Sequence, residues 1–417
     1  MRQRTVVVLL IYNLFALLCL PYGLAVAQTK PQSVAESPTS PFVLKNGDRV
    51  VFLGNSLFEN DFQYGYLELA LTTRWPDRDV TYRNLGWTGD NVFGVARGNI
   101  TNPPTAYELL MDHLTKAQPT VVFVAYGGIE AEEGEAGLPA FKEGLTKLLD
   151  KIDQLGAKAI LLSPIPILAA DSAESLTKRN AMLELYAATI AKTATERSTR
   201  YIDIFKPIQE INRKGALTEN GIHLNETGYY YLATILEKGL GLPPRTEPVA
   251  ITVSKAAVEA AAPAKMLDSG ANSASLKFTI NERYLPLPLP VADSGRTIPG
   301  QVVKIAGLKK GFYRLTAGNS EVVTASASQW ADGVDIRQGP SFEQVHELRQ
   351  MILKKNELFF FQYRPMNTTY ILGMRAHEQG RHVKGLEEQS ILIKWLEGQI
   401  AVNRTPVSRV YQLTLLK

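Results

Sequence analysis

Short apolar runs alternate with longer amphipathic segments over the first 240 residues of the chain. The runs are rich in β-branched residues and have the length of buried strands, whereas the longer segments repeat apolar residues every three or four positions, as helices do. The predicted strands are 49–53, 80–83, 120–125, 159–163 and 201–205, and the predicted helices include 64–74, 106–116, 138–154 and 178–193. This alternation predicts an α/β domain over residues 44–242, with a five-stranded parallel sheet covered by helices on both faces.

The pattern changes near Gly241. Residues 243–275 are rich in Ala, Pro and Ser and are expected to form a linker. Beyond it, 276–287 and 302–326 are typical of short strands, with a turn at Ala317-Gly318-Asn319-Ser320, and 341–361 and 386–400 have helical spacing. Residues 276–417 are therefore expected to form a smaller α+β region.

The first residues have the features of an export leader. Arg2 and Arg4 precede an apolar run over 6–20, and Ala25-Val26-Ala27 provides small residues for cleavage after Ala27. The alternative is an uncleaved membrane anchor, because the run approaches the length that spans a bilayer. Cleavage predicts an extracytoplasmic protein, periplasmic or secreted, without integral membrane association. Residues 28–43, which are polar and rich in Pro, are expected to form a flexible tether.

Composition excludes several kinds of chemistry. Cys19 is the only cysteine and lies in the leader, so the mature chain has no thiolate for catalysis or for zinc. Removal of the two leader arginines lowers the formal charge from +4 to +2, which gives no long-range attraction for nucleic acid. His377 and Glu378 match no metal-ligand spacing, so a solvated surface or a buried polar joint with the first domain is expected there.

Ligands of parallel sheets bind at the carboxyl ends of the strands, so residues that follow predicted strands are candidates for function. Ser56 follows the first strand in Gly54-Asn55-Ser56-Leu57, on a turn where backbone N–H groups favour an oxyanion. The alternative is that Ser56 only caps a helix. His223 follows the last strand after a short helix, and His113, the other histidine of this region, lies in a helical pattern that favours a surface role. His223 is therefore the candidate base.

These segments resemble the SGNH (GDSL-like) hydrolase family over about residues 45–240. The Gly-Asp-Ser-Leu block of the family corresponds to Gly54-Asn55-Ser56-Leu57, and its Asn-x-Gly-x-x-Gly block to the segment from Asn84 to Gly89. The resemblance implies a flavodoxin-like three-layer fold, Ser56 as nucleophile and His223 as base. It also implies that the backbone N–H groups of Ser56 and Gly89 form the oxyanion hole, with Asn84 and Trp87 near the substrate.

Two departures from the family pattern affect groups with a catalytic part. The family's oxyanion Asn corresponds to Ile129, which has no side-chain donor, and its triad Asp corresponds to Asn220. Asn220 can orient an imidazole but carries no charge, and the neighbouring Glu219 is a candidate substitute for the carboxylate. Loss of one oxyanion donor typically lowers the rate by about 10²–10³-fold.

The resemblance implies a serine esterase without a cofactor. For an exported chain, the expected substrates are O-acyl, chiefly O-acetyl, esters of carbohydrates or other small molecules. Trp87 and Tyr126 are candidate stacking surfaces. Packing beneath the loop is the alternative for both, and it is the preferred interpretation for Tyr126. The rival hypothesis is a weakened or inactive SGNH-fold protein that binds a glycan or a protein. A phospholipid-directed lipase is disfavoured because the mature sequence has no basic amphipathic segment.

Overall fold

The fold was taken from a computed structural model. It describes residues 40–98, 104–170, 172–213, 217–269, 275–291, 298, 300–364 and 383–416. The predicted leader, most of the tether, and His377 and Glu378 lie outside these ranges. Phe42 and Leu44 are already buried, and the N–H of Phe42 donates to the carbonyl of Leu240 at 2.8 Å. The ordered domain therefore begins a few residues before Lys45, and the tether that we predicted to residue 43 is slightly too long.

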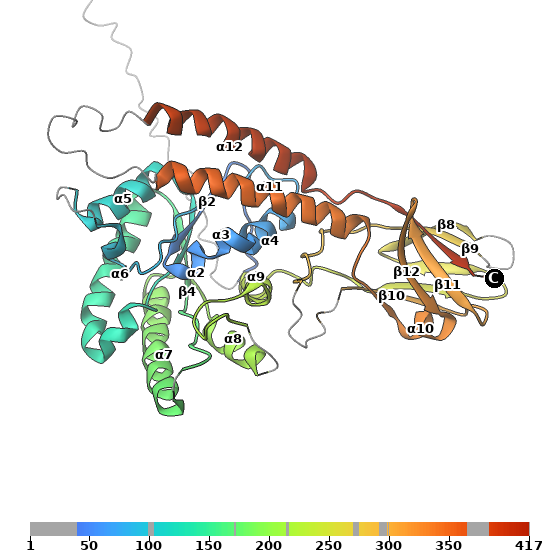
Figure 1. Ribbon diagram of the computed structural model, residues 1–417, viewed down its shortest axis with the longest axis horizontal. Helices are drawn as coiled ribbons and strands as arrows, with labels where there is room; N and C mark the ends of the chain where they lie inside the picture. Colours follow the sequence, from blue (N-terminus) through green and yellow to red (C-terminus); the bar gives the residue numbers. More distant parts are fainter. Residues whose placement is uncertain are drawn as a thin grey trace, which may run out of the picture. The chain divides into compact units, whose positions relative to one another are not determined.

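The first domain contains the five-stranded parallel sheet that the sequence predicted (Figure 1). Its strand order is β2-β1-β3-β4-β5, and every neighbouring pair is parallel. The strands are β1 (Arg49–Gly54), β2 (Thr81–Asn84), β3 (Val121–Ala125), β4 (Lys158–Leu162) and β5 (Arg200–Ile202). The predicted bounds differ from these by at most three residues.

Helices cover both faces of this sheet because successive strand residues point to opposite sides. In β1, Val50 and Phe52 join one buried cluster and Val51 and Leu53 join the other. The helices of this domain are α2 (Ser56–Glu59), α3 (Asp61–Tyr64), α4 (Tyr66–Arg74), α5 (Ala106–Lys116), α6 (Leu138–Gln154), α7 (Ala173–Glu196), α8 (Phe205–Asn212) and α9 (Glu226–Gly239), with 3-10 turns η1 (Val95–Arg97) and η2 (Glu130–Gly137). The α/β prediction is confirmed.

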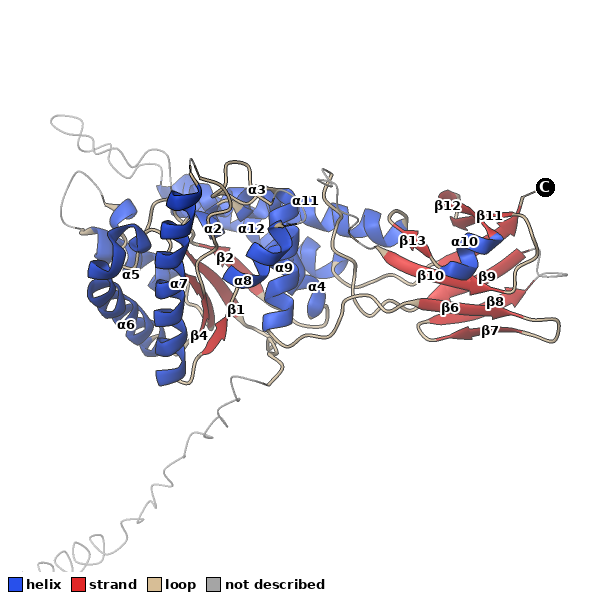
Figure 2. Ribbon diagram, turned by 90° about the horizontal axis from the view of Figure 1, so that it is seen from below, coloured by secondary structure: helices blue, strands red, loops and turns tan. Residues whose placement is uncertain are grey.

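The second region is built around two β-sheets that share one buried core (Figure 2). One has the order β13-β10-β6-β7 and the other β12-β11-β14-β9-β8. The strands are β6 (Val249–Val253), β7 (Val258–Ala261), β8 (Ala264–Ser269), β9 (Ser275–Ile280), β10 (Gln301–Ala306), β11 (Phe312–Ala317), β12 (Ser320–Ser326), β13 (Val334–Ile336) and β14 (Val410–Leu415), with helix α10 (Ala327–Asp332).

The prediction of a linker over 243–275 is wrong for most of that stretch, which contains β6, β7 and β8. The sequence pattern did not predict these strands because they contain many alanines, and strands are usually recognised by their β-branched and aromatic residues. In β6, however, Val249, Ile251 and Val253 are buried at every second position. The sandwich therefore starts at Val249, well before residue 276.

Two long helices that lie between β13 and β14 in the sequence pack on the first domain. They are α11 (Pro340–Tyr363) and α12 (Val383–Asn403), and they contact each other (Figure 1). Val345, Leu348 and Ile352 of α11 belong to the core on one face of the parallel sheet, and Phe359 belongs to the core on the other face. A buried ion pair adds to this contact: Lys355 Nζ lies 2.7 and 2.8 Å from the carboxylate oxygens of Glu68. Helices α11 and α12 therefore complete the first domain.

Candidate active site

A cavity of about 310 Å³ opens at the carboxyl edge of the parallel sheet. Its lining comes from segments that follow β1, β3, β4 and β5, as expected for a ligand site on this fold. Both Ser56 and His223 line it. The structure thus brings together the two residues that the sequence placed at the ends of different strands.

The backbone leaves β1 by a close passage beside β3. A Cβ on Gly54 would lie only 2.5 Å from the carbonyl oxygen of Ala125, so a residue with a side chain does not fit here. Asn55 then caps α2 by accepting the N–H of Leu57 at 3.1 Å, and Ser56 is the first residue of the helix. Because Asn55 is the cap, Ser56 Oγ is not needed for that role, and the side chain lies at the cavity.

His223 is oriented by Asn220. Asn220 Oδ1 accepts the backbone N–H groups of Ile222 and His223 at 3.1 and 2.9 Å, and its Nδ2 lies 3.0 Å from His223 Nδ1. The two backbone donors fix which end of the amide faces the ring. An N–H donor at Nδ1 favours the neutral tautomer with its proton on Nε2. That tautomer cannot accept a proton at Nε2, so Asn220 opposes the base role of the ring.

Glu219 has another partner in the structure. Its Oε1 accepts the hydroxyl hydrogen of Tyr64 at 2.8 Å, while its backbone N–H donates to the carbonyl of His223. Burial, followed by the hydrogen bond to Glu219, raises the pKa of Tyr64 to about 12. The side chain in hydrogen-bond contact with the imidazole is therefore that of Asn220.

The loop after β2 is held tightly against α2. Asn84 Nδ2 donates to the carbonyl of Phe58 at 2.6 Å, and Asn84 Oδ1 accepts the N–H of Gly86 at 2.9 Å. A Cβ on Gly86 would lie 2.3 Å from the backbone nitrogen of Glu59, which requires glycine at this contact. Both ends of the Asn84 amide thus stabilise the loop, and the structure gives Asn84 a positioning role.

Gly89 lies at the end of this loop with φ of +79°, a conformation that favours glycine. Neither its N–H nor that of Ser56 donates to another group in the described residues. Thr88, next to it, donates its N–H to Glu59 of α2. Within the described residues the two predicted oxyanion donors thus have no acceptor, and of the two only Ser56 is among the residues that line the cavity.

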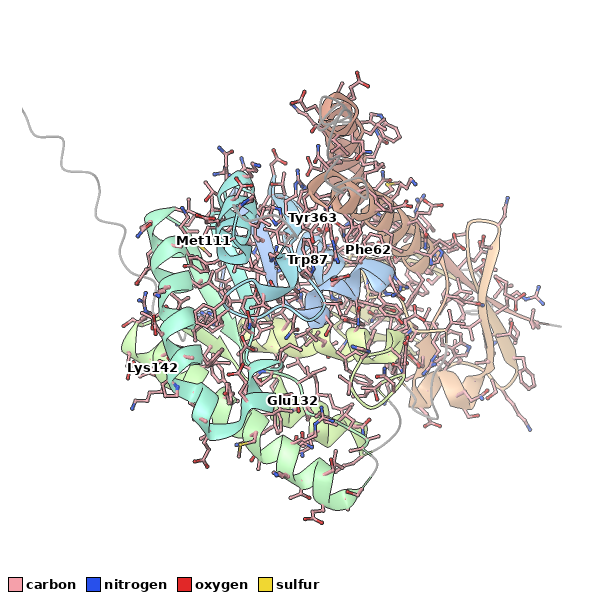
Figure 3. The ribbon with its side chains drawn as sticks, turned by 60° about the vertical axis from the view of Figure 1, so that its left-hand side comes forward. Phe62, Trp87, Met111, Glu132, Lys142 and Tyr363 are labelled. Carbon is pink, nitrogen blue, oxygen red and sulfur yellow. The ribbon has the colours of Figure 1, made fainter. Side chains whose placement is uncertain are left out.

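Trp87 lies in an aromatic and cationic cluster and is not among the described residues that line the cavity. The guanidinium of Arg364 lies 3.7 Å from the centre of its ring, and the ring of His113 stacks at 6.1 Å. Tyr363 also contacts Trp87, as Figure 3 shows. Trp87 therefore packs between the loop after β2 and the end of α11. It does not line the cavity, where a sugar would have to stack.

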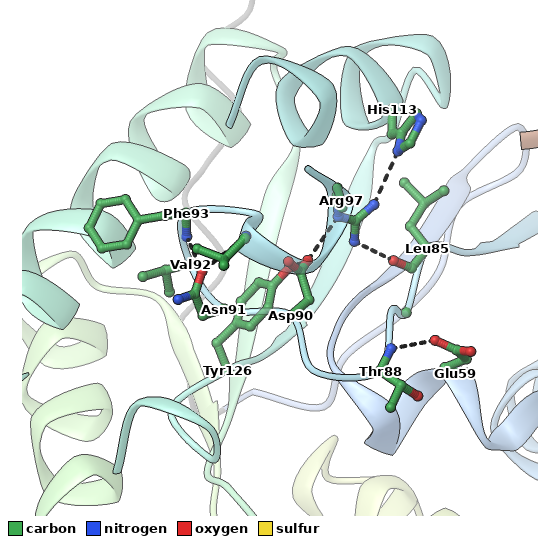
Figure 4. A network of polar contacts seen from close by, with 12 residues as sticks. Glu59, Leu85, Thr88, Asp90, Asn91, Val92, Phe93, Arg97, His113 and Tyr126 are labelled. Atoms are coloured by element: carbon green, nitrogen blue, oxygen red, sulfur yellow. Dashed lines mark hydrogen bonds and ion pairs between the residues drawn. The ribbon is translucent and has the colours of Figure 1, made fainter. Parts of the chain in front are cut away.

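A buried ion pair lies under the same loop (Figure 4). Arg97 Nε donates to Asp90 Oδ2 at 2.8 Å, both side chains are fully buried, and the hydroxyl of Tyr126 donates to the same oxygen at 3.0 Å. Arg97 Nη1 lies 3.2 Å from His113 Nδ1. The surface role predicted for His113 is wrong, because its ring belongs to this network. The packing alternative for Tyr126 agrees with its 1% exposure.

Ile129 projects at the cavity with 41% of its surface exposed. The next residue, Glu130, is buried and accepts the N–H groups of Val92 and Gly127 at 3.0 and 2.8 Å. Burial raises the pKa of Glu130. The glutamate thus joins the loop after β2 to the loop after β3 and leaves position 129 facing the substrate side.

Several lining residues were missed by the sequence reading. They are Asn60 of the α2–α3 junction, Glu132 and Arg179, which form an ion pair, and Pro164, Ile165, Pro166 and Ile167 after β4. The last four directly follow a strand, so the rule that found Ser56 would have found them too. The ion pair of Glu132 with Arg179 joins η2 to α7. No short sequence pattern predicts it, because the two residues lie far apart in the chain.

The described ranges contain no group of three or more His, Cys, Asp or Glu side chains that could hold a metal ion. Within the same ranges, no helix is long and apolar enough to cross a membrane.

The first domain is thus an α/β domain in which Ser56 and His223 line one cavity at the carboxyl edge of a parallel sheet. The sequence model of the GDSL-like Lipase/Acylhydrolase family matches residues 52–231. The first domain therefore has the fold of SGNH hydrolases, and its residues 52–231 are similar in sequence to the GDSL-like family. A search of curated proteins found no match.

Solved structures extend the likeness of fold to the second region. A gut microbial diltiazem-metabolizing enzyme aligns with a TM-score of 0.70 and 18% identity over 90% of this chain and 99% of its own. An acetylxylan esterase from Geobacillus stearothermophilus aligns at a TM-score of 0.40 and 15% identity over 48% of this chain and 98% of its own. The first comparison shows that another protein combines the same hydrolase-like domain and C-terminal region.

Proposed function

We propose that the protein is an exported serine esterase that hydrolyses O-acyl esters, chiefly O-acetyl esters, of carbohydrates or other small molecules. The observation that carries this proposal is that Ser56 and His223 line one cavity at the carboxyl edge of the sheet. Export rests on the leader-like residues 1–27. No metal or organic cofactor enters the chemistry.

In the proposed reaction, Ser56 Oγ attacks the ester carbonyl while His223 Nε2 takes the hydroxyl proton. The Oγ–C bond forms and the carbonyl electron pair moves onto oxygen, where the N–H groups of Ser56 and Gly89 stabilise the charge. His223 then protonates the departing alcohol, and water activated by the same ring releases the acid. The ring must first adopt the Nδ1–H tautomer, which breaks its hydrogen bond with Asn220, so we propose a slow enzyme.

The cavity supports a small acyl group. Its volume is about 310 Å³, and its walls include the apolar side chains of Ile129, Ile165 and Leu183, which suit a short acyl chain. The ion pair of Arg179 with Glu132 at the same cavity offers polar groups to an alcohol moiety such as a sugar. Short acyl esters of polar alcohols fit this combination best.

A fluorophosphonate probe together with p-nitrophenyl acetate tests the proposal. Wild-type protein should be labelled covalently and should release p-nitrophenol, and Ser56→Ala should abolish both. Ser328→Ala, which changes an exposed serine of α10, should retain both. A series of acetate, butyrate and octanoate esters then tests the acyl preference, and acetylated xylo-oligosaccharides test the alcohol.

One observation favours a second function on the same fold. The N–H of Asn220 at His223 Nδ1 and the loss of a donor at Ile129 are both changes that weaken ester hydrolysis. The rival is therefore an inactive domain that binds a glycan or a protein. Absence of labelling and of turnover in wild type, together with calorimetric binding of an unmodified oligosaccharide, would support the rival and reject the esterase.

A further inference from the structure

The side chain of Asn55 offers an N–H group to the same cavity. Its Oδ1 accepts the N–H of Leu57 at 3.1 Å, which fixes the amide plane and directs Nδ2 to the other side. Asn55 lines the cavity with Ser56 and Ile129, and 9% of its surface is exposed. Within the described residues, the side-chain hydrogen bond of Asn55 uses Oδ1 and leaves Nδ2 for a ligand.

The position of Nδ2 is further defined by Gly128. A Cβ built on Gly128 would lie 3.4 Å from Asn55 Nδ2, so the amide reaches the backbone just before position 129. The Asn55 amide and the residue at 129 thus border the same part of the cavity from two different loops. The amide of Asn55 therefore lies beside the loop on which the family carries its oxyanion Asn.

We propose that Asn55 Nδ2 is the third oxyanion donor of this centre and takes the part that Ile129 cannot play. This inference rests on the proposed esterase function. In the tetrahedral intermediate, the bond from Ser56 Oγ to the carbonyl carbon has formed and the oxygen carries the negative charge. The charge is stabilised by the backbone N–H groups of Ser56 and Gly89 and by Asn55 Nδ2.

Helix capping alone gives no reason for an amide at position 55. The cap uses only Oδ1, and an aspartate would accept the N–H of Leu57 equally well. The amide differs from a carboxylate only in its N–H₂ group. Asn55→Asp therefore keeps the cap and removes the donor, which separates the two roles.

The experiment measures kcat, KM and Tm for p-nitrophenyl acetate hydrolysis by Asn55→Asp, Asn55→Leu and the double variant Asn55→Leu/Ile129→Asn. We expect both single variants to lower kcat by about 10²–10³-fold with KM changed less than threefold. Asn55→Asp should keep the wild-type Tm. In the double variant, the new amide at 129 should recover at least tenfold in kcat.

Asn60→Asp is the control for charge, because Asn60 lines the same cavity but caps nothing with its side chain. Its loss of kcat should be at least tenfold smaller than that of Asn55→Asp. Retention of kcat within threefold in Asn55→Asp, or no recovery in the double variant, would overturn the inference while Ser56-dependent turnover still supports the esterase. Wild-type protein without Ser56-dependent turnover would overturn both.

Discussion

The guanidinium of Arg364 lies over the ring of Trp87, 3.7 Å from its centre. Arg364 also pairs with Glu59 at 3.2 Å, and Glu59 accepts the N–H of Thr88, next to Gly89. The hydroxyl of the preceding Tyr363 donates to the carbonyl of Gly86 at 2.9 Å. The end of α11 therefore holds the loop that presents the proposed oxyanion donor Gly89.

Arg364→Ala should lower kcat for p-nitrophenyl acetate by about tenfold, because part of the oxyanion stabilisation depends on the position of Gly89. KM should change little, since the residue is remote from the cavity lining. Arg404→Ala is the matched control: Arg404 Nε donates to the carbonyl of Pro76 at 2.9 Å and also joins the C-terminal region to the first domain. That control should lower Tm without lowering kcat. Equal kcat values for the two variants would contradict the positioning role.

Asn220→Asp should raise kcat, by tenfold or more and up to about 10⁴-fold. One carboxylate oxygen would still accept the N–H groups of Ile222 and His223, and the other would accept an N–H at Nδ1, which leaves Nε2 free to take the serine proton. Steady-state kinetics measures the gain. Glu219→Gln made in parallel tests the alternative that Glu219 provides the carboxylate; a large loss in that variant with no gain in Asn220→Asp would favour Glu219.

Lys355→Met should destabilise the protein by about 3–5 kcal/mol, because it leaves the carboxylate of Glu68 buried without its cation. Lys355 and Glu68 are 1% and 5% exposed, and Asn356 Nδ2 also donates to the carboxylate at 2.9 Å. Lys354→Met is the control, since Lys354 is exposed and pairs only with Glu357, an interaction worth at most about 1 kcal/mol. Chemical denaturation compares the two. Similar losses would mean that burial of the pair is unimportant.

His113 should make the fold sensitive to mild acid. Burial lowers the pKa of His113 to about 4, and the guanidinium of Arg97 acts in the same direction, against an ordinary value of about 6.5 in the unfolded chain. The unfolded state therefore binds more protons between pH 6.5 and 4, and stability falls by about 2–3 kcal/mol as the pH drops through this window. His113→Gln should flatten that dependence, whereas His346→Gln, on the exposed side of α11, should not. Denaturation curves at pH 7 and 4.5 give the test.

The sequence predicted the parallel sheet and the two residues at its carboxyl edge, because short stretches of the chain carry the pattern for both. Ser56 and His223 were found because the parallel sheet gathers the ends of its strands, and β1, β3 and β4 at its centre are continuous apolar runs. Arg364 and Tyr363 could not be found in this way, because their contacts join residues far apart in the chain. The strands β6 to β8 were missed because alanine-rich segments carry little pattern. The amide of Asn55 was visible as a departure from the family block, but its direction depends on a hydrogen bond that only the structure shows.

The central place of β14 has a consequence for the order of assembly. This strand pairs with β9 on one side and β11 on the other. The central strand of the five-stranded sheet is therefore absent until residues 410–415 have paired with both neighbours. The parallel sheet pairs strands that lie much closer in sequence. Since contacts between distant residues require larger loops to close and form more slowly, we expect the sandwich to fold last and refolding to show a late phase reported by Tyr411 and Trp330 in its core.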